Sequence, residues 1–173
     1  MGHRNNRGLV PDLAHLRDRD HLLITMVCYG NICRSPMAAA VLNNKLKKRN
    51  IDGITVDSAG TSNWHIGEGP NQPAKRVWEK AGYKYEHVAS QFNYARLVAA
   101  DIVLVMDEHN HQQVSQLVTS DEESAKIYYL REFDESAPSL VVPDPYSMPD
   151  SAFESVLEMV ERATDGLLKS LNR

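Results

Sequence analysis

Four short apolar runs alternate along the chain with longer stretches in which apolar residues recur at helical spacing. The runs cover residues 22–28, 54–57, 102–106 and 127–130. Runs of this length are typical of strands, and their alternation with helical segments is typical of parallel sheets. The third run is apolar throughout, as expected of a central strand covered on both faces. The pattern predicts an α/β fold, a doubly wound four-stranded parallel sheet with helices on both faces.

Two helices are predicted most clearly. The first begins near Pro36, and its run MAAAVL at 37–42 has high helix propensity and should be buried against the sheet. The basic cluster at 45–49 is interpreted as the end of this helix, where cations complement the helix dipole. The last helix should start with a capping box of Ser151 and Glu154, followed by an apolar stripe that packs on the sheet. This stripe comprises Phe153, Val156, Leu157, Val160, Leu167, Leu168 and Leu171.

Two segments rich in Gly, Pro, Asn and Ser, at 58–73 and 131–150, are predicted loops. Both follow strands, so both should lie at the carboxyl edge of the sheet, where doubly wound folds bind ligands. Residues 1–20 lack the apolar core of a signal peptide, and we interpret them as a poorly ordered extension. The length of the rest suits one domain, residues 21–173.

Composition excludes several classes of function. The chain has 173 residues, 42% of them hydrophobic and 24% charged, as in soluble globular proteins. A formal charge of -4 offers no basic field for nucleic acid, and no apolar run is long enough to cross a membrane. Two cysteines make neither a disulfide framework nor a complete structural zinc site. We expect a cytoplasmic protein without metal or nucleic-acid partner, with signal-independent export as an open alternative.

Both cysteines fall in the stretch VCYGNICRSP, residues 27–36. Cys28 ends a predicted strand, and Gly30 and Asn31 tolerate positive φ, so the loop can curl and point its amides inward at a helix N-terminus. Such a phosphate-binding loop, between the first strand and the first helix, would also stabilise a thiolate, and Arg34 can bind two phosphoryl oxygens. The alternative is that Cys28 and Cys33 are merely small buried side chains.

The pattern Cys-x5-Arg-Ser at a strand-to-helix turn resembles the low-molecular-weight protein tyrosine phosphatase family. The similarity continues through 57–61, Trp64, His65, 100–101, 106–107, Asn110 and 144–146, and so covers the chain from residue 22 onward. The resemblance implies an enzyme without a cofactor that acts on phosphotyrosine-containing proteins. We expect it to be a monomer or a weak homodimer.

The resemblance also implies how the reaction runs. Cys28 attacks phosphorus to form a phosphocysteine, while Arg34 and the loop amides stabilise the transferring phosphoryl group. Asp144, between Pro143 and Pro145, acts as general acid and then as general base. By residue type alone, Pro-Asp-Pro is more often just a turn.

The resemblance also implies further roles, but the motifs behind them are less specific. Phosphate or substrate contacts are assigned to Tyr29, Gly30, Asn31, Ile32, Cys33, Ser35, Trp64 and Tyr146, and support of the loop to Asn31, Ser58, His87 and Asp107. Structural alternatives are a helix cap for Ser35 and Asp107, and a core position for Trp64. Cys33 is also spaced to form a disulfide with Cys28 under peroxide, which would make the enzyme redox-regulated.

Two positions depart from the family pattern. Tyr29 occupies a site that usually holds a smaller residue, and Ser147 stands where a second tyrosine is common. Three rival functions fit these residues less well. An arsenate reductase of this fold needs two cysteines downstream of Cys33, and none is present. A protein-arginine phosphatase typically has threonine at the position of Ile32, and a non-catalytic phosphotyrosine-binding module would lack the nucleophile or the acid.

Overall fold

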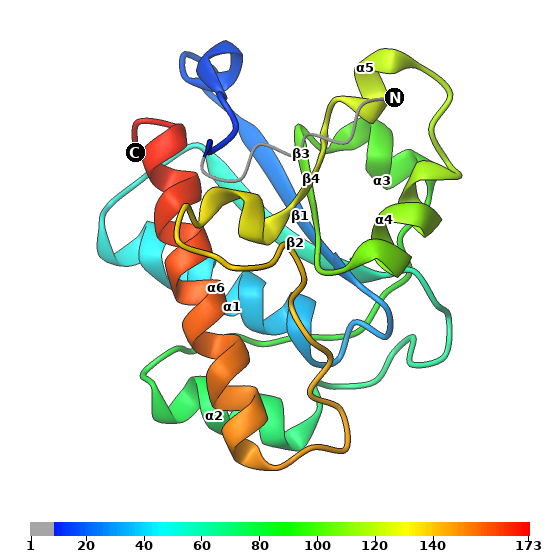
Figure 1. Ribbon diagram of the computed structural model, residues 1–173, viewed down its shortest axis with the longest axis vertical. Coiled ribbons are helices and arrows are strands. Elements are labelled where there is room, and N and C mark those ends of the chain that lie inside the picture. The colour runs from blue at the N-terminus through cyan, green and yellow to red at the C-terminus, as the bar shows by residue number, and fades with distance from the viewer. Residues whose placement is uncertain (1–8) are drawn as a thin grey trace.

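Four parallel strands form the sheet of this computed structural model, which describes residues 9–173 (Figure 1). Their order across the sheet is β2-β1-β3-β4, so the first and third strands are central, as predicted for the third. Backbone pairing is parallel throughout, with Leu22 opposite Ile54 and Ile24 opposite Ile102. The strands are β1 (Leu22–Cys28), β2 (Ile54–Gly60), β3 (Ile102–Val105) and β4 (Ile127–Tyr129).

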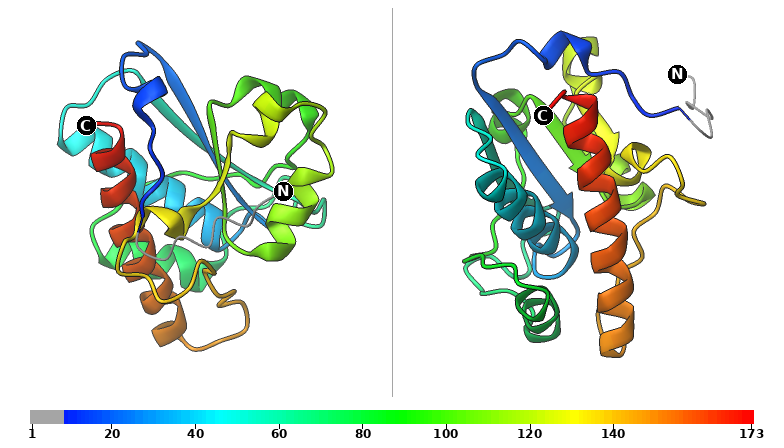
Figure 2. Two further views of the ribbon diagram at one scale, coloured as in Figure 1. Left: turned by 45° about the horizontal axis from the view of Figure 1, so that its top comes forward. Right: turned by 90° about the vertical axis from the view of Figure 1, so that its left-hand side faces the viewer.

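Helices cover both faces of the sheet, which confirms the doubly wound prediction. One apolar cluster joins β1 and β3 to α1, α2 and α6, and a second joins the opposite face to α3 and α4 (Figure 2). None of the helices within residues 9–173 is long and apolar enough to cross a membrane. The helices are α1 (Arg34–Lys48), α2 (Gln72–Lys80), α3 (Tyr94–Ala99), α4 (Glu108–Ser115), α5 (Asp121–Ser124) and α6 (Asp150–Ser170), with 3-10 turns η1 (Ala14–Leu16) and η2 (Leu130–Phe133).

Helix α1 follows the sequence prediction closely. Every residue from Met37 to Leu42 is fully buried, so the small alanine side chains bring the helix axis close to the sheet. Lys45, Lys47 and Lys48 lie in its last turn, where they complement the helix dipole. The buried start of α1 fixes the position of the loop that precedes it.

Predicted and observed boundaries differ most at two places. Strand β2 continues to Gly60, because Ser58 to Gly60 pair with Met26 to Cys28 in β1, and this ladder overrides a composition typical of a loop. Helix α6 begins at Asp150 and its N-cap is Pro149, which provides no side-chain cap. Ser151 therefore lies inside the first turn, and the predicted capping box does not form.

The structure also differs from the prediction of a poorly ordered segment over residues 1–20. Residues 1–8 lie outside the described residues. Within the remainder, Leu13 and Leu16 are buried in the main apolar cluster. The segment is fastened to the other end of the chain, since Arg17 Nε donates to the carbonyl of Ser170 at 3.0 Å and Ser170 Oγ to that of Pro11 at 3.3 Å. Leu13 and Leu16, three residues apart, supply the apolar contacts that anchor this segment.

Candidate active site

The loop between β1 and α1 curls tightly around the end of its strand. Cys28 is the last residue of β1, and α1 begins six residues later at Arg34. Asn31 has a left-handed φ of 57°, which reverses the chain between them. Gly60 of β2 lies underneath, where a Cβ atom would come within 2.7 Å of the Tyr29 carbonyl oxygen. The loop therefore requires glycine at this position of the neighbouring strand.

Hydrogen-bond donors surround the sulfur of Cys28. The amide of Asn31 donates to Sγ at 3.3 Å, and Ser35 Oγ lies 2.9 Å from it. Asn31 Nδ2 donates to Ser35 Oγ at 2.8 Å, which leaves the serine's own hydrogen for the sulfur. This arrangement favours a thiolate at Cys28. Ser35 lies inside α1 after an N-cap at Cys33, so the helix-cap alternative does not hold.

The side chain of Asn31 holds the loop from behind and is fully buried. Its amide nitrogen also donates to Ser58 Oγ at 3.0 Å, and its oxygen accepts from the amide of Ser90 at 2.9 Å. The carbonyl of Asn31 lies 2.6 Å from Nε2 of His87, which must therefore carry the hydrogen. Burial lowers the pKa of His87, and this hydrogen bond offsets part of the shift. Ser58 and His87 thus both contact Asn31 of the loop.

Arg34, the first residue of α1, is only 3% exposed. Its Nη1 donates to Asp107 Oδ2 at 2.6 Å and to the carbonyl of Val142 at 3.0 Å, while Nη2 lies 3.7 Å from Asp144 Oδ2. The other oxygen of Asp107 accepts from the amide of Asn110 at 2.8 Å. Asp107 is therefore both the N-cap of α4 and a partner of Arg34, so both interpretations of this residue apply.

Charge around Arg34 keeps its guanidinium protonated. Burial lowers its pKa, but the charges of Cys28, Asp107 and Asp144 outweigh this and raise the pKa above its ordinary range. Removal of any one of these anions leaves a buried cation less well paired.

Asp144 approaches from a different part of the chain. Val142, just before it, donates its amide to the carbonyl of Met106 at 2.7 Å, which ties this segment to the end of β3. The Asp144 side chain is half exposed, and its Oδ1 accepts from the amide of Tyr146 at 3.1 Å. Ser147 then adopts a left-handed φ of 64°. A thiol, a guanidinium and a carboxylate thus meet at the carboxyl edge of the sheet.

Comparison with known proteins agrees with this arrangement. The family model described as low molecular weight phosphotyrosine protein phosphatase matches residues 23–173. The chain belongs to this family. Its enzyme class is accordingly that of the protein-tyrosine phosphatases, which are hydrolases. One relative is low molecular weight protein-tyrosine phosphatase A of Mycobacterium bovis, 39% identical over 151 residues, which are 86% of this chain and 90% of the relative.

Solved structures share the fold of this phosphatase. A protein tyrosine phosphatase from Entamoeba histolytica, with Hepes in the active site, matches with a TM-score of 0.83 and 26% identity over 87% of this chain and 97% of its own. The drosophila arginine phosphatase DARP matches with a TM-score of 0.80 and 25% identity over 84% and 95%. These similarities confirm the α/β fold and the family resemblance.

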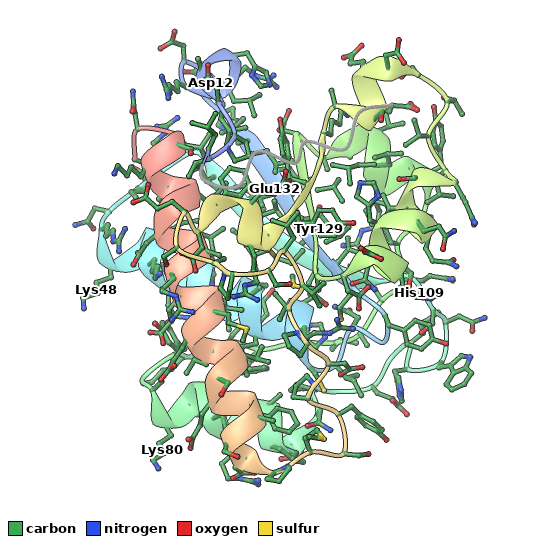
Figure 3. The ribbon with its side chains drawn as sticks, in the orientation of Figure 1. Asp12, Lys48, Lys80, His109, Tyr129 and Glu132 are labelled. Carbon is green, nitrogen blue, oxygen red and sulfur yellow. The ribbon has the colours of Figure 1, made fainter. Side chains whose placement is uncertain are left out.

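Aromatic side chains form a rim at one side of the phosphatase loop. The ring centroid of Tyr29 lies 6.0 Å from that of Trp64, edge to face, and 5.7 Å from that of His109. His109 lies at the start of α4 (Figure 3). Trp64 is 74% exposed, so the alternative of a core tryptophan is wrong. Tyr146, two residues after Asp144, is also exposed. Exposed rings are available to contact a substrate.

The remaining residues of the loop are constrained by their neighbours. A Cβ at Gly30 would lie 3.1 Å from the ring of His65, and the carbonyl of Ile32 accepts from the amide of Asn71 at 2.9 Å. Burial raises the pKa of Cys33 to about 12, the charges of Cys28 and Asp144 add to this, and Arg34 opposes it. Cys33 is therefore a protonated thiol at neutral pH.

Several polar residues around the loop were missed by sequence reasoning. His109 joins the rim, and Thr25, Asp57, Ser90 and Arg96 form a polar chain behind Asn31. The available signal was weak. Thr25 interrupts the otherwise apolar β1, and Asp57 is a charged residue in β2, but only the fold brings them to Ser90 and Arg96.

Proposed function

We propose that this phosphatase hydrolyses phosphotyrosine in proteins through a phosphocysteine on Cys28. The observation that carries the proposal is the position of the buried Arg34, which lies next to the curled loop of Cys28 and 3.7 Å from Asp144. A phosphoryl group bound by the loop amides and this guanidinium would lie between the nucleophile and the acid. The proposal follows the family, whose members are named for this reaction.

In the first step, the Cys28 thiolate attacks phosphorus and the bond to the tyrosine oxygen breaks. Asp144 gives its proton to the leaving phenolate. In the second step, water attacks phosphorus, Asp144 takes a proton from it, and the sulfur–phosphorus bond breaks to release phosphate. Arg34 and the amides of the loop stabilise the charge of the transferring group in both steps, and Ser35 stabilises the departing thiolate.

The rim favours an aryl phosphate as substrate. Trp64, Tyr29 and Tyr146 offer aromatic faces and edges to a phenyl ring, and the half-buried Ile32 adds an apolar contact in the loop. A phosphoguanidino group would gain less from these contacts. Phosphoarginine is the second candidate substrate, because the similar DARP structure is that of an arginine phosphatase.

The test is a substrate panel without added metal: p-nitrophenyl phosphate and peptides carrying phosphotyrosine, phosphoserine or phosphoarginine. We expect the phosphotyrosine peptide to be preferred by at least about tenfold in kcat/KM, and Cys28→Ser to abolish turnover. Preference for phosphoarginine would replace the proposed substrate. Unchanged turnover by Cys28→Ser would refute the mechanism.

We also propose that Cys33 protects the nucleophile from oxidation, in a cytoplasmic enzyme that is a monomer or a weak homodimer. Peroxide oxidises the Cys28 thiolate to a sulfenic acid; the Cys33 thiol then displaces water to give a disulfide, which a thiol reductant opens. Both cysteines are free and buried in the reduced protein. After peroxide and then dithiothreitol, Cys33→Ser should regain less activity than the parent, and equal recovery would reject this role.

A further inference from the structure

Arg96 of α3 lies behind the phosphate loop and joins two segments that flank it. Its Nη1 donates to Ser90 Oγ at 2.7 Å, and its Nη2 donates to Asp57 Oδ2 and to the carbonyl of Ser58, each at 3.0 Å. The backbone of Arg96 is itself fixed, because its amide donates to the N-cap side chain of Asn93 at 3.0 Å. One guanidinium therefore holds the 90 segment against β2.

Asp57, which accepts a hydrogen bond from Arg96, is itself held in the sheet. Asp57 Oδ1 accepts from Thr25 Oγ1 at 2.5 Å, and Thr25 is fully buried in β1. Ser90 is held twice more, since its carbonyl accepts from the amide of Gly60 at 2.8 Å and its Oγ lies 3.3 Å from the carbonyl of Ser58. The Arg96 side chain is about one quarter exposed, so these bonds are partly shielded from water.

Ser90 determines the direction of the hydrogen bonds that end at the nucleophile. Its backbone amide can only donate, so the side-chain atom of Asn31 that faces it must be the oxygen. The amide nitrogen of Asn31 then faces Ser35, and Ser35 in turn directs its hydrogen to Cys28 Sγ. A displaced Ser90 would release Asn31 to rotate, and the donor to the sulfur would be lost.

We propose that Arg96 is a positioning residue for the nucleophile. It acts through Ser90 and Asn31 to keep the Ser35 hydroxyl aimed at Cys28, and thereby favours the thiolate. The proposal rests on the proposed function only in taking Cys28 as the nucleophile. It differs from a purely structural role of the Arg96–Asp57 ion pair, which would affect stability and leave the thiolate unchanged.

The experiment measures the rate at which iodoacetate alkylates Cys28 between pH 4 and 8, followed by mass spectrometry, together with the thermal midpoint and p-nitrophenyl phosphate kinetics. The charged and titratable groups around Cys28 are Arg34, Cys33, Asp107, Asp144 and His87, and every variant retains them. Cys33 stays protonated over this range, because burial raises its pKa to about 12. The alkylation profile therefore reports on Cys28.

In Arg96→Gln, we expect the midpoint of this profile to move up by about half to one pH unit, which is a three- to tenfold lower alkylation rate on the acid side. KM should change less than twofold. Arg96→Lys retains the charge opposite Asp57, but one ammonium cannot span all three acceptors. It should recover the thermal midpoint without recovering the alkylation profile.

Ser90→Ala is the milder variant, because it removes the acceptor of Arg96 and keeps the backbone amide that faces Asn31. It should shift the profile in the same direction, and the double variant with Arg96→Gln should shift no further than Arg96→Gln alone. Arg49→Gln, which breaks the exposed pair with Asp165 at the far end of α1, serves as the control and should match the parent.

A parent-like profile in both Arg96→Gln and Ser90→Ala, with only the thermal midpoint lowered, would overturn the positioning role. Additive shifts in the double variant would also overturn it, since they would show that Arg96 does not act through Ser90. A shifted profile in a protein that hydrolyses no phosphate ester would support Arg96 and refute the proposed function, so the two failures are distinguishable.

Discussion

The phosphate loop and the segment that carries Asp144 are built in opposite ways. In the loop, Cys28, Asn31, Arg34 and Ser35 are each at most 3% exposed, and side chains from several elements hold them. In the segment after Val142, the Asp144, Tyr146 and Met148 side chains are about half exposed, and the hydrogen bonds within it are local, joining residues two or three positions apart.

This difference matches what each region has to do in the proposed reaction. The donors that face the phosphoryl group must be in place before the charge develops, which favours a buried and cross-braced loop. The acid and the aromatic rings must admit a protein side chain and release its product, which favours an exposed segment with few tertiary bonds. Substitutions in the two regions should therefore have different kinetic signatures.

The largest effect is expected in the buried region. Arg34→Lys keeps one positive charge but cannot reach Asp107, the Val142 carbonyl and a phosphoryl group together. We expect kcat to fall about 10²- to 10³-fold, as for loss of a preorganised donor. Steady-state kinetics measure the fall in kcat, and a thermal melt of the same variant checks that it folds. A loss of kcat smaller than that of Asp144→Asn would show that the buried loop is not the more sensitive of the two regions.

The next effect concerns Asp144. Asp144→Asn removes the proton donor but not the fold, because the side chain is half exposed. We expect about a 10²-fold loss of kcat for phosphotyrosine and a smaller loss for substrates with acidic leaving groups. A series of aryl phosphates measures the trend. Asp150→Asn, a half-exposed aspartate nearby, is the control, and equal losses for all leaving groups would remove Asp144 as the acid.

A smaller effect is expected at the rim. Trp64→Ala removes the most exposed aromatic ring next to Tyr29 without disturbing the core. We expect KM for a phosphotyrosine peptide to rise about three- to tenfold with kcat nearly unchanged. Ile66→Ala, two residues along and also exposed, should leave KM unchanged. A fall in kcat instead would show that the rim belongs with the preorganised region.

The smallest effect concerns the pH dependence of stability. Burial lowers the pKa of His87 in the folded protein below its ordinary value of 6.5. The unfolded chain thus binds more protons below that pH, so folded stability falls as the pH drops from 6.5. The thermal midpoint of the parent should decline more steeply there than that of His87→Gln. Equal slopes would show that His87 does not couple the loop to pH.

Parts of the fold could be predicted because a local pattern sufficed. The apolar run of β1 and the alanines of α1 determine their own burial. The end of β2 could not be predicted, because Ser58 to Gly60 are held by pairing with β1 rather than by their own propensity. The start of α6 was predicted wrongly for the opposite reason: Ser151 has a good capping pattern, but the chain enters the helix two residues earlier, with Pro149 as the N-cap.

The residues of the active site also fall into those with a local sequence signal and those without one. Cys28, Arg34 and Ser35 share one short motif, and the family resemblance pointed to Asp144, Ser58 and His87. Ser90 and Arg96 had no such signal. Their role depends on hydrogen bonds to residues 38 to 59 positions away, which only the folded chain brings together.

The segment that begins at Pro11 has a consequence for biosynthesis. Its bonds to Ser170 join residues 153 and 159 positions apart, so they can close only after the last turn of α6 has left the ribosome. A segment that is made before the sheet is thus fastened only after α6 is complete. Leu13 and Leu16 belong to the same apolar cluster as Leu167 and Leu168 of α6, so this cluster is complete only once both ends of that cluster have been synthesised.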